Sequence, residues 1–117
     1  MDESRPIFLQ IAEQLENSII DGTFAEEKQV PSTNELAAFH RINPATALKG
    51  VSHLVDNGIL YKRRGIGMFV SSGARARLRD RRREQFAQLY VQPLLAEAHK
   101  LGLTTDEVKA MLDGGNP

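Results

Sequence analysis

The sequence of 117 residues contains no cysteine, which excludes disulfide bonds, zinc–thiolate sites and thiol chemistry. It also has no apolar run that approaches the roughly 18 residues of a membrane-spanning helix. The segment from Met1 to Arg5 lacks the basic and apolar regions of a signal peptide. These absences predict a cytoplasmic protein that has no membrane partner.

A net charge is also missing, since fifteen bases balance fifteen acids. The distribution is uneven: residues 1–40 carry two bases and eight acids, and residues 84–117 carry two bases and five acids. Residues 41–83 carry eleven bases and two acids, a net charge of +9. Because salt confines the influence of each charge to about 8–10 Å, local charge decides binding to a polyanion, and residues 41–83 are the candidate segment.

The sequence shows no set of residues that is typical of an enzyme. His40, His53 and His99 fall in three different predicted elements. No nucleophile stands with a base, and no carboxylate cluster marks a metal site. We therefore expect a protein that is not an enzyme and that holds no metal and no cofactor.

The hydrophobic fraction of 41% is enough for one small domain with an appendage. Apolar residues at spacings of three and four predict a first helix over residues 6–20. Ser32 and Glu35 stand three apart, as a capping box requires, and predict a second, shorter helix that begins there.

A third helix is predicted over residues 44–57, with Asn43 as its N-cap and Pro44 as its first residue. Its short separation from the second helix, together with its basic residue, matches a helix-turn-helix. One face of the helical wheel is apolar and is expected in the core: Ala47, Leu48, Val51, Leu54 and Val55. The opposite face carries polar groups that suit base edges and phosphates in a major groove: Thr46, Lys49 and His53. A solvated surface face is the alternative.

Two short strands are predicted over residues 59–62 and 68–70, joined by a tight turn at residues 63–67. Arg63 and Arg64 make this turn basic, and its glycines let backbone approach a surface closely. Such a tip fits a minor groove or clamps a phosphate. A plain β-turn is the alternative explanation of the glycines.

The remaining chain predicts a long helix over residues 74–101, which Pro93 should kink or split, and a last helix that begins at Thr104. Two short helices cannot hide all of their large apolar side chains, so the surplus favours a homodimer. The residues of this surplus are Phe86, Leu89, Tyr90, Leu94, Leu101, Val108, Met111 and Leu112. The alternative is a tail that folds back onto the preceding helices and hairpin of its own chain.

Only 47 residues follow Val70, fewer than a separate ligand-binding domain of ordinary size contains, so we expect no separate effector domain. A small-molecule effector, if the protein has one, is expected in a small pocket between the tail helices or between the tail and the preceding domain.

Six arginines cluster at the start of the long helix: Arg75, Arg77, Arg79, Arg81, Arg82 and Arg83. They suit nonspecific steering of DNA, and they equally suit a solvated linker helix. Both interpretations stay open.

Four blocks of residues, in order and at their usual spacing, carry a family resemblance. They are Pro31-Ser32-x-x-Glu35-Leu36-Ala37, Ile42-Asn43-Pro44-x-Thr46, Leu54-x-x-x-Gly58-Ile59-Leu60 and Arg64-Gly65-x-Gly67-Met68-Phe69-Val70. Residues 6–71 resemble the winged helix-turn-helix domain of GntR-family bacterial transcription regulators. The Asn-Pro pair before a short helical tail is similar to the YtrA-like subfamily.

The resemblance implies a mainly α-helical protein with a small β-hairpin. A winged helix-turn-helix DNA-binding domain would span residues 1–71, and a helical dimerisation tail residues 72–117. The implied function is a homodimeric repressor that binds a palindromic operator, with residues 44–57 in the major groove and residues 63–67 in the minor groove. The alternative is an architectural protein that binds DNA by charge without reading its sequence.

The expected DNA contacts lie on the polar wheel face, at the helix N-termini and on the hairpin tip. They are Ser32, Asn34, Asn43, Ala45, Thr46, Lys49, His53, Arg63, Arg64, Gly65 and Gly67. The chain departs from the family pattern at four positions. Asn34 stands where Arg is usual, Ala45 where the subfamily has Asn, Glu27 where Gly is common, and Gly50 where a small helix-former is expected.

Overall fold

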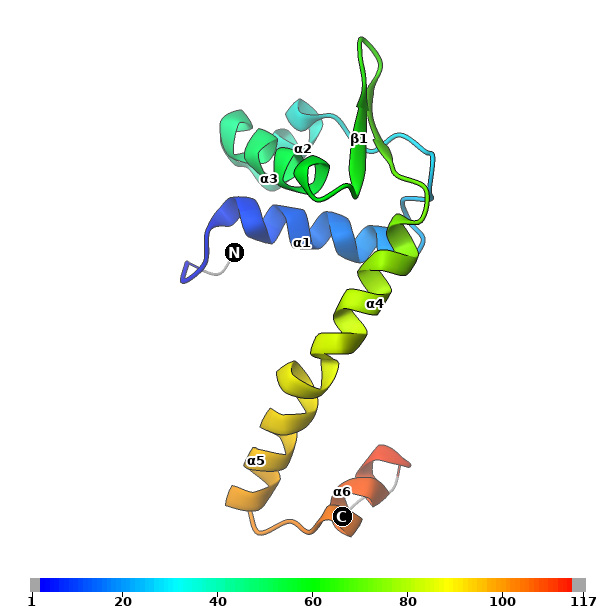
Figure 1. The fold of residues 1–117 in the computed structure, drawn as a ribbon. Helices are drawn as coiled ribbons and strands as arrows, with labels where there is room; N and C mark the ends of the chain where they lie inside the picture. Colours follow the sequence, from blue (N-terminus) through cyan, green and yellow to red (C-terminus); the bar gives the residue numbers. More distant parts are fainter. Residues whose placement is uncertain (1–2, 115–117) are drawn as a thin grey trace. The chain divides into compact units, whose positions relative to one another are not determined.

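The computed structural model describes residues 3–114, and within that range it is mainly helical with a two-stranded antiparallel hairpin, as the sequence predicts (Figure 1). The chain forms two compact units, divided between Arg79 and Asp80. In chain order the elements are α1 (Ile7–Ile20), α2 (Thr33–His40), α3 (Pro44–Asp56), β1 (Leu60–Arg63), β2 (Gly67–Val70), α4 (Ala74–Phe86), the π-helical segment η1 (Ala87–Val91), α5 (Gln92–Lys100) and α6 (Thr105–Leu112).

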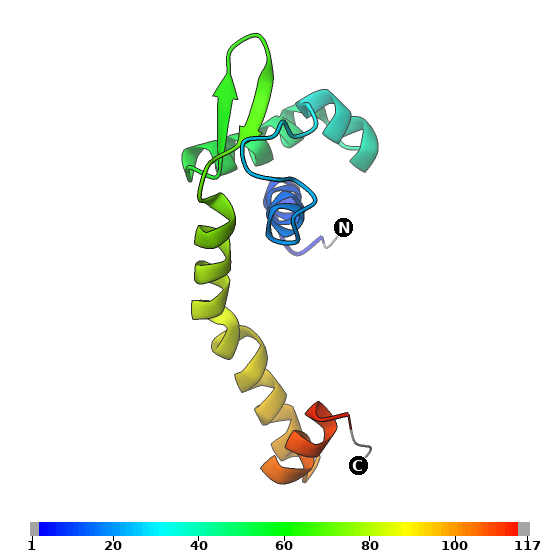
Figure 2. The same ribbon diagram turned by 90° about the vertical axis from the view of Figure 1, so that its right-hand side faces the viewer.

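In the first unit, α2, α3 and the hairpin lie on one side of α1, and the hairpin projects beyond the helices (Figures 1 and 2). The predicted apolar stripe of α1 is buried at Ile11, Leu15 and Ile19. It packs mainly against α3, where Val51 and Leu54 are buried. Burying a side chain of this size stabilises the fold by about 1.5–3 kcal/mol.

The backbones of α1 and α3 come close together at Gly50. A Cβ added there would lie 2.8 Å from the carbonyl oxygen of Phe8 and 3.3 Å from the Cβ of Ile11. The absence of a side chain therefore lets the two helices cross at short range, which offsets the low helix propensity of glycine. Since Gly50 is buried, the inward face of α3 is turned by about 50° from the face centred on Val51.

This rotation of the inward face of α3 corrects one expectation about the core. Leu48 was expected to be buried, but it is 49% exposed. The helical wheel located the inward face from the large apolar residues alone, whereas a glycine also faces α1 at short range.

The predicted helix starts are confirmed. The Ser32 backbone N–H donates to Oε1 of Glu35 (3.0 Å), and the Glu35 backbone N–H donates to Oγ of Ser32 (3.1 Å), which completes the capping box. At the start of α3, Oδ1 of Asn43 accepts the backbone N–H of Ala45 at 2.8 Å. Arg41 adopts a left-handed conformation (φ 54°) that ends α2 and sets the turn.

The hairpin is wider than the sequence predicts, because the segment before α2 pairs with β2. The Val30 backbone N–H donates to the Met68 carbonyl (2.9 Å), and the Val70 backbone N–H donates to the Lys28 carbonyl (3.0 Å). A β-bridge joins Gln29 and Phe69 between these bonds. One edge of the hairpin is therefore held by backbone bonds to the rest of the first unit.

The first unit extends beyond the expected domain boundary at residue 71. Ala74 and Leu78 are buried in its core, so the first turns of α4 belong to it. Arg75 Nε donates to the Ile20 carbonyl at 2.9 Å, and the Arg77 guanidinium donates to the Gly58 carbonyl at 2.7 Å. These two arginines thus satisfy carbonyl groups at the ends of α1 and α3.

In the second unit, the interruption expected from Pro93 lies in the turn before it. Pro93 has no N–H to donate, and its ring would clash with the carbonyl four residues earlier in an α-helix. The backbone widens instead: the Gln92 N–H reaches the Ala87 carbonyl, a spacing of five residues. After α5, a capping box of Thr104 and Glu107 begins α6 as predicted.

None of the helices that the structure describes is both long and apolar enough to cross a membrane.

Candidate nucleic-acid interface

The outward face of α3 is the part of the predicted interface that differs most from expectation. Ala45 and Lys49 are exposed, as predicted for DNA contacts, whereas Thr46 and His53 are half-buried. Leu48, expected in the core, and half-buried Ser52 share the outward face with Ala45. The sequence analysis missed Leu48 and Ser52 as interface candidates, and the signal that could have found them was Gly50 as a contact position.

Phe8 in α1 holds two of the predicted contact side chains. Nζ of Lys49 lies 4.3 Å from the centroid of the Phe8 ring, and the His53 ring meets the same ring edge-on at 6.1 Å. The ammonium of Lys49 is thus attracted to the ring face while it stays exposed to solvent. Lys49 therefore lies on the outward face with Ala45 and Ser52, with Phe8 beside it on the α1 side, and Leu48 lies toward the opposite edge of that face.

The N-termini of α2 and α3 present hydrogen-bond donors. Oγ of Ser32 accepts the Glu35 backbone N–H, so its hydroxyl hydrogen can donate to a phosphate oxygen. Asn43 uses Oδ1 within its cap, which leaves the amide NH₂ as a donor. Asn34 is exposed in the first turn of α2. The positive end of each helix dipole adds to the attraction for an anion.

The capping box also sets the charge at this end of α2. The Ser32 backbone N–H donates to the ionised carboxylate of Glu35 and holds its pKa below the ordinary value. A lowered pKa means that the cap stabilises the fold above the ordinary pKa and loses this effect as the pH falls through the lowered one. The cap is therefore intact at neutral pH.

The hairpin tip carries the two predicted arginines in different surroundings. The guanidinium carbon of Arg63 lies 5.0 Å from the centroid of the Phe69 ring, which also stacks on Tyr61. Arg64 is exposed at the tip beside Gly65, whose φ of +76° is a left-handed conformation. Nothing lies within 4 Å of a Cβ built on Gly65, so the backbone there is open to close approach. Arg64 and Gly65 are therefore the part of the tip that is most accessible to a partner.

Gln29 braces this tip, and the sequence analysis missed it. Its Nε2 donates to the Ile66 carbonyl at 2.9 Å. The same amide occupies the space that a Cβ on Gly67 would take, and Gly67 has a φ of +146°. Gly67 thus contributes to the tip by giving room to Gln29. No local pattern marks Gln29, because its partner lies 37 residues away.

We expect Gln29→Ala to loosen the hairpin tip. A hydrogen bond of this kind contributes about 1 kcal/mol, which corresponds to roughly fivefold faster hydrogen exchange at the Ile66 amide. That amide donates to the Arg63 carbonyl across the turn and reports its opening. The neighbouring exposed Lys28→Ala serves as the control. Equal exchange rates in the Gln29 variant and the original protein would contradict the bracing role.

The arginine cluster is divided by the structure. Arg75 and Arg77 bond to backbone carbonyls in the first unit. In the second unit Arg83 pairs with Asp80 at 3.4 Å, with both side chains more than two-thirds exposed. An exposed pair of this kind contributes little stability. Arg79 and Arg82 are exposed on the same helix.

The apolar surplus predicted for the tail is largely exposed. The exposed members are Phe86, Leu89, Tyr90, Leu94, Leu101, Met111 and Leu112, and the structure adds Val91 and Leu95. Val108 differs from this set, because it is 7% exposed and packs inside the second unit, where Ala98 is also buried. Val108 therefore stabilises the unit that presents the surface and contributes little area to it.

Comparisons with known proteins bear on this interface. The sequence profile described as "Bacterial regulatory proteins, gntR family" matches residues 8–70. The transcriptional repressor YtrA of Bacillus subtilis is 31% identical, over 96% of this chain and 91% of its own. A GntR-family regulator from Bacteroides thetaiotaomicron is 32% identical with a TM-score of 0.71, over 92% of this chain and 94% of that chain. The AraR DNA-binding domain in complex with operator ORX1 is 29% identical with a TM-score of 0.56, over 61% of this chain and 87% of that chain.

Proposed function

Because the chain belongs to the GntR family of bacterial DNA-binding transcription regulators, we propose that it is a cytoplasmic, homodimeric repressor that binds a palindromic operator sequence-specifically. In this proposal α3 enters the major groove and the tip of the hairpin reaches the minor groove. The function requires no cofactor, since charge and hydrogen bonding supply the binding. The matched family and relatives are transcription regulators and not enzymes.

One observation carries the proposal: α2, α3 and the hairpin lie on the same side of α1 (Figure 2). Donors at Ser32 and Asn43, the outward face of α3 and the exposed Arg64 all come from these elements. Phosphate contacts from helix N-termini fix the position of such a domain, and side chains on the recognition helix then read base edges. The similar AraR domain, which is in complex with operator ORX1, supports DNA binding by this unit.

The exposed apolar surface of the second unit supports the dimer. Large apolar side chains that stay exposed on short helices favour self-association. A two-fold axis lets one surface serve both protomers, and it separates two recognition helices by one DNA turn or a multiple of it. The repressor role is supported by the similarity to YtrA over nearly the whole chain.

Selection of bound sequences from a random DNA pool by the full chain tests the proposal. We expect an inverted repeat whose half-sites are one helical turn apart or a multiple of it. The selected site should bind at least about 10³-fold more tightly than random DNA. An affinity ratio near one would instead favour an architectural protein, for which exposed Arg79 and Arg82 would supply the charge.

We expect Arg64→Ala to weaken operator binding and to reduce the slope of log affinity against log salt by about one. Arg64 is exposed at the open end of the hairpin, where a cation can meet a phosphate. Arg83→Ala is the matched comparison, because it removes the same charge from the exposed pair with Asp80. Fluorescence anisotropy across a salt series measures both variants. An unchanged affinity and slope for Arg64→Ala would contradict the placement of the tip.

A further inference from the structure

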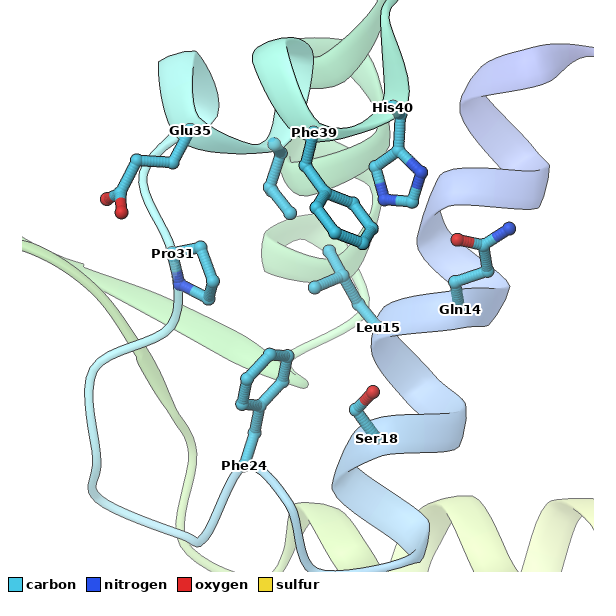
Figure 3. Close-up of a pocket in the computed structure, with 9 residues that line it drawn as sticks. Gln14, Leu15, Ser18, Phe24, Pro31, Glu35, Phe39 and His40 are labelled. Atoms are coloured by element: carbon cyan, nitrogen blue, oxygen red, sulfur yellow. The ribbon is translucent and has the colours of Figure 1, made fainter.

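A pocket of about 440 Å³ lies in the first unit between α1, α2 and the loop that joins them (Figure 3). Its apolar walls are Leu15, Phe24, Pro31, Leu36 and Phe39, and its polar groups come from Gln14, Ser18, Glu35 and His40. This volume falls within the range of small-molecule sites, roughly 300–1,000 Å³, and the mixture of apolar walls with a few polar groups is typical of them. The place differs from the expected effector positions, which all involved the tail.

Phe39 forms an uncovered wall of this pocket. Its side chain is 82% exposed, although the buried core of the first unit lies directly beside it. The ring points over Leu15 and toward the pocket (Figure 3), and its edge-to-face contact with His40 at 4.9 Å favours that orientation. A ligand seated there would remove this apolar surface from water without first moving the ring.

The charge around the pocket has one sign. Among the nine lining residues, all of which the structure describes, Glu35 carries the formal charge. All nine come from residues 1–40, a segment that contains eight acidic and two basic residues. The Ser32 N–H that lowers the pKa of Glu35 keeps this carboxylate ionised at neutral pH. Such a site repels anions, whereas the rings of Phe24 and Phe39 attract a cation through their faces.

We propose that this pocket binds a hydrophobic organic cation, such as a quaternary ammonium or phosphonium with aromatic or alkyl substituents. The substituents fill the space between Leu15, Phe24 and Phe39, and the ring faces attract the positive centre. The Glu35 carboxylate, which bonds to the Ser32 N–H at the rim and points away from the rings in Figure 3, adds a negative field. Aromatic rings are a recognised way to bind such cations, because a quaternary cation loses less hydration on binding than an ammonium ion does. The site does not depend on the proposed DNA-binding function.

Two ions of nearly the same shape and opposite charge test the proposal. The full chain is titrated by calorimetry with tetraphenylphosphonium and with tetraphenylborate at pH 8. We expect the phosphonium to bind at least about tenfold more tightly, because only the charge differs between the two probes. Chemical-shift changes should centre on the nine lining residues. Equal or tighter binding of the borate, or shift changes confined to residues 80–114, would overturn the proposal.

Variants locate the site. Phe39→Ala should weaken phosphonium binding at least about tenfold and leave the melting temperature nearly unchanged, because the ring is mostly exposed. Phe86→Ala, at an exposed phenylalanine of the second unit, should not affect binding. Glu35→Gln keeps a side chain that a capping box accepts and should reduce the preference for the cation.

Ser18→Leu provides a second variant, which fills the pocket from α1 and should also block binding. Undiminished binding in Phe39→Ala and Ser18→Leu would refute the site. A change of association state in Phe39→Ala, measured by light scattering, would also refute the ligand site. Phe39 would then lie in a contact between two copies of the chain.

Discussion

Replacing Leu89 with aspartate is expected to convert the proposed dimer into monomers and to weaken operator binding by about two orders of magnitude. Leu89 is 56% exposed in η1, and Tyr90 and Phe86 beside it are more than half exposed. A carboxylate in the centre of an apolar interface costs several kcal/mol because it loses its hydration without gaining a partner. A monomer binds each half-site separately and loses the roughly 10²–10⁴-fold gain of a linked pair.

Sedimentation equilibrium and operator titration measure the two consequences of Leu89→Asp. Gln88→Asp is the matched control, since it adds the same charge to the neighbouring exposed position of η1. We expect Gln88→Asp to keep the dimer and most of the affinity. If the Leu89→Asp variant is still dimeric, the interface lies elsewhere. If the unsubstituted protein is monomeric at micromolar concentration, binding of the operator as a dimer is excluded.

The sequence predicted those parts of the fold that local chemistry controls. The capping boxes at Ser32 and Thr104, the Asn43 cap and the antiparallel hairpin follow from residues close together in the chain, and all are confirmed. The family resemblance is also confirmed, since the GntR profile matches more than half of the chain. Spacing of this kind is read directly from the sequence because each contact spans only a few residues.

Long-range contacts limited the prediction of the site. The outward face of α3 depends on which side meets α1, and that choice is made by Gly50 beside Phe8 rather than by the largest apolar residues. The bracing of the tip by Gln29 depends on a partner 37 residues away. Neither contact leaves a periodic signal, so a wheel drawn for one isolated helix could not locate it.

Glu27 shows how one departure from the family pattern is accommodated. It has a φ of +65°, a conformation that glycine adopts more easily, and the family commonly has glycine at this position. The Tyr61 hydroxyl donates to Oε2 of Glu27 at 2.6 Å. This bond raises the pKa of Tyr61, because the phenol would lose a hydrogen bond on ionising beside a carboxylate. The side chain of Glu27 thus ties a strained loop position to β1, a contact that glycine could not make.

Gly50→Ala is expected to lower the free energy of unfolding of the first unit by about 2 kcal/mol and its melting temperature by about 10 °C. Alanine would gain about 1 kcal/mol from helix propensity, so an exposed glycine in α3 would give the opposite sign. At this position the new Cβ would stand 2.8 Å from the Phe8 carbonyl oxygen. The obstacle is backbone rather than a movable side chain, so α1 and α3 must separate and lose contact along their buried faces.

Urea unfolding followed by circular dichroism measures this change, and Ser52→Ala serves as the control. Ser52 lies two residues further along α3 and is half-buried, so its replacement adds helix propensity without a backbone clash. We expect Ser52→Ala to leave stability within about 0.5 kcal/mol of the original. Gly50→Ala should also weaken operator binding, because a displaced α3 no longer holds its outward face in register with the hairpin tip. A Gly50→Ala variant as stable as the Ser52→Ala protein would show that α1 and α3 have room for a side chain where they cross. The close approach at Gly50 would then not explain which face of α3 points outward.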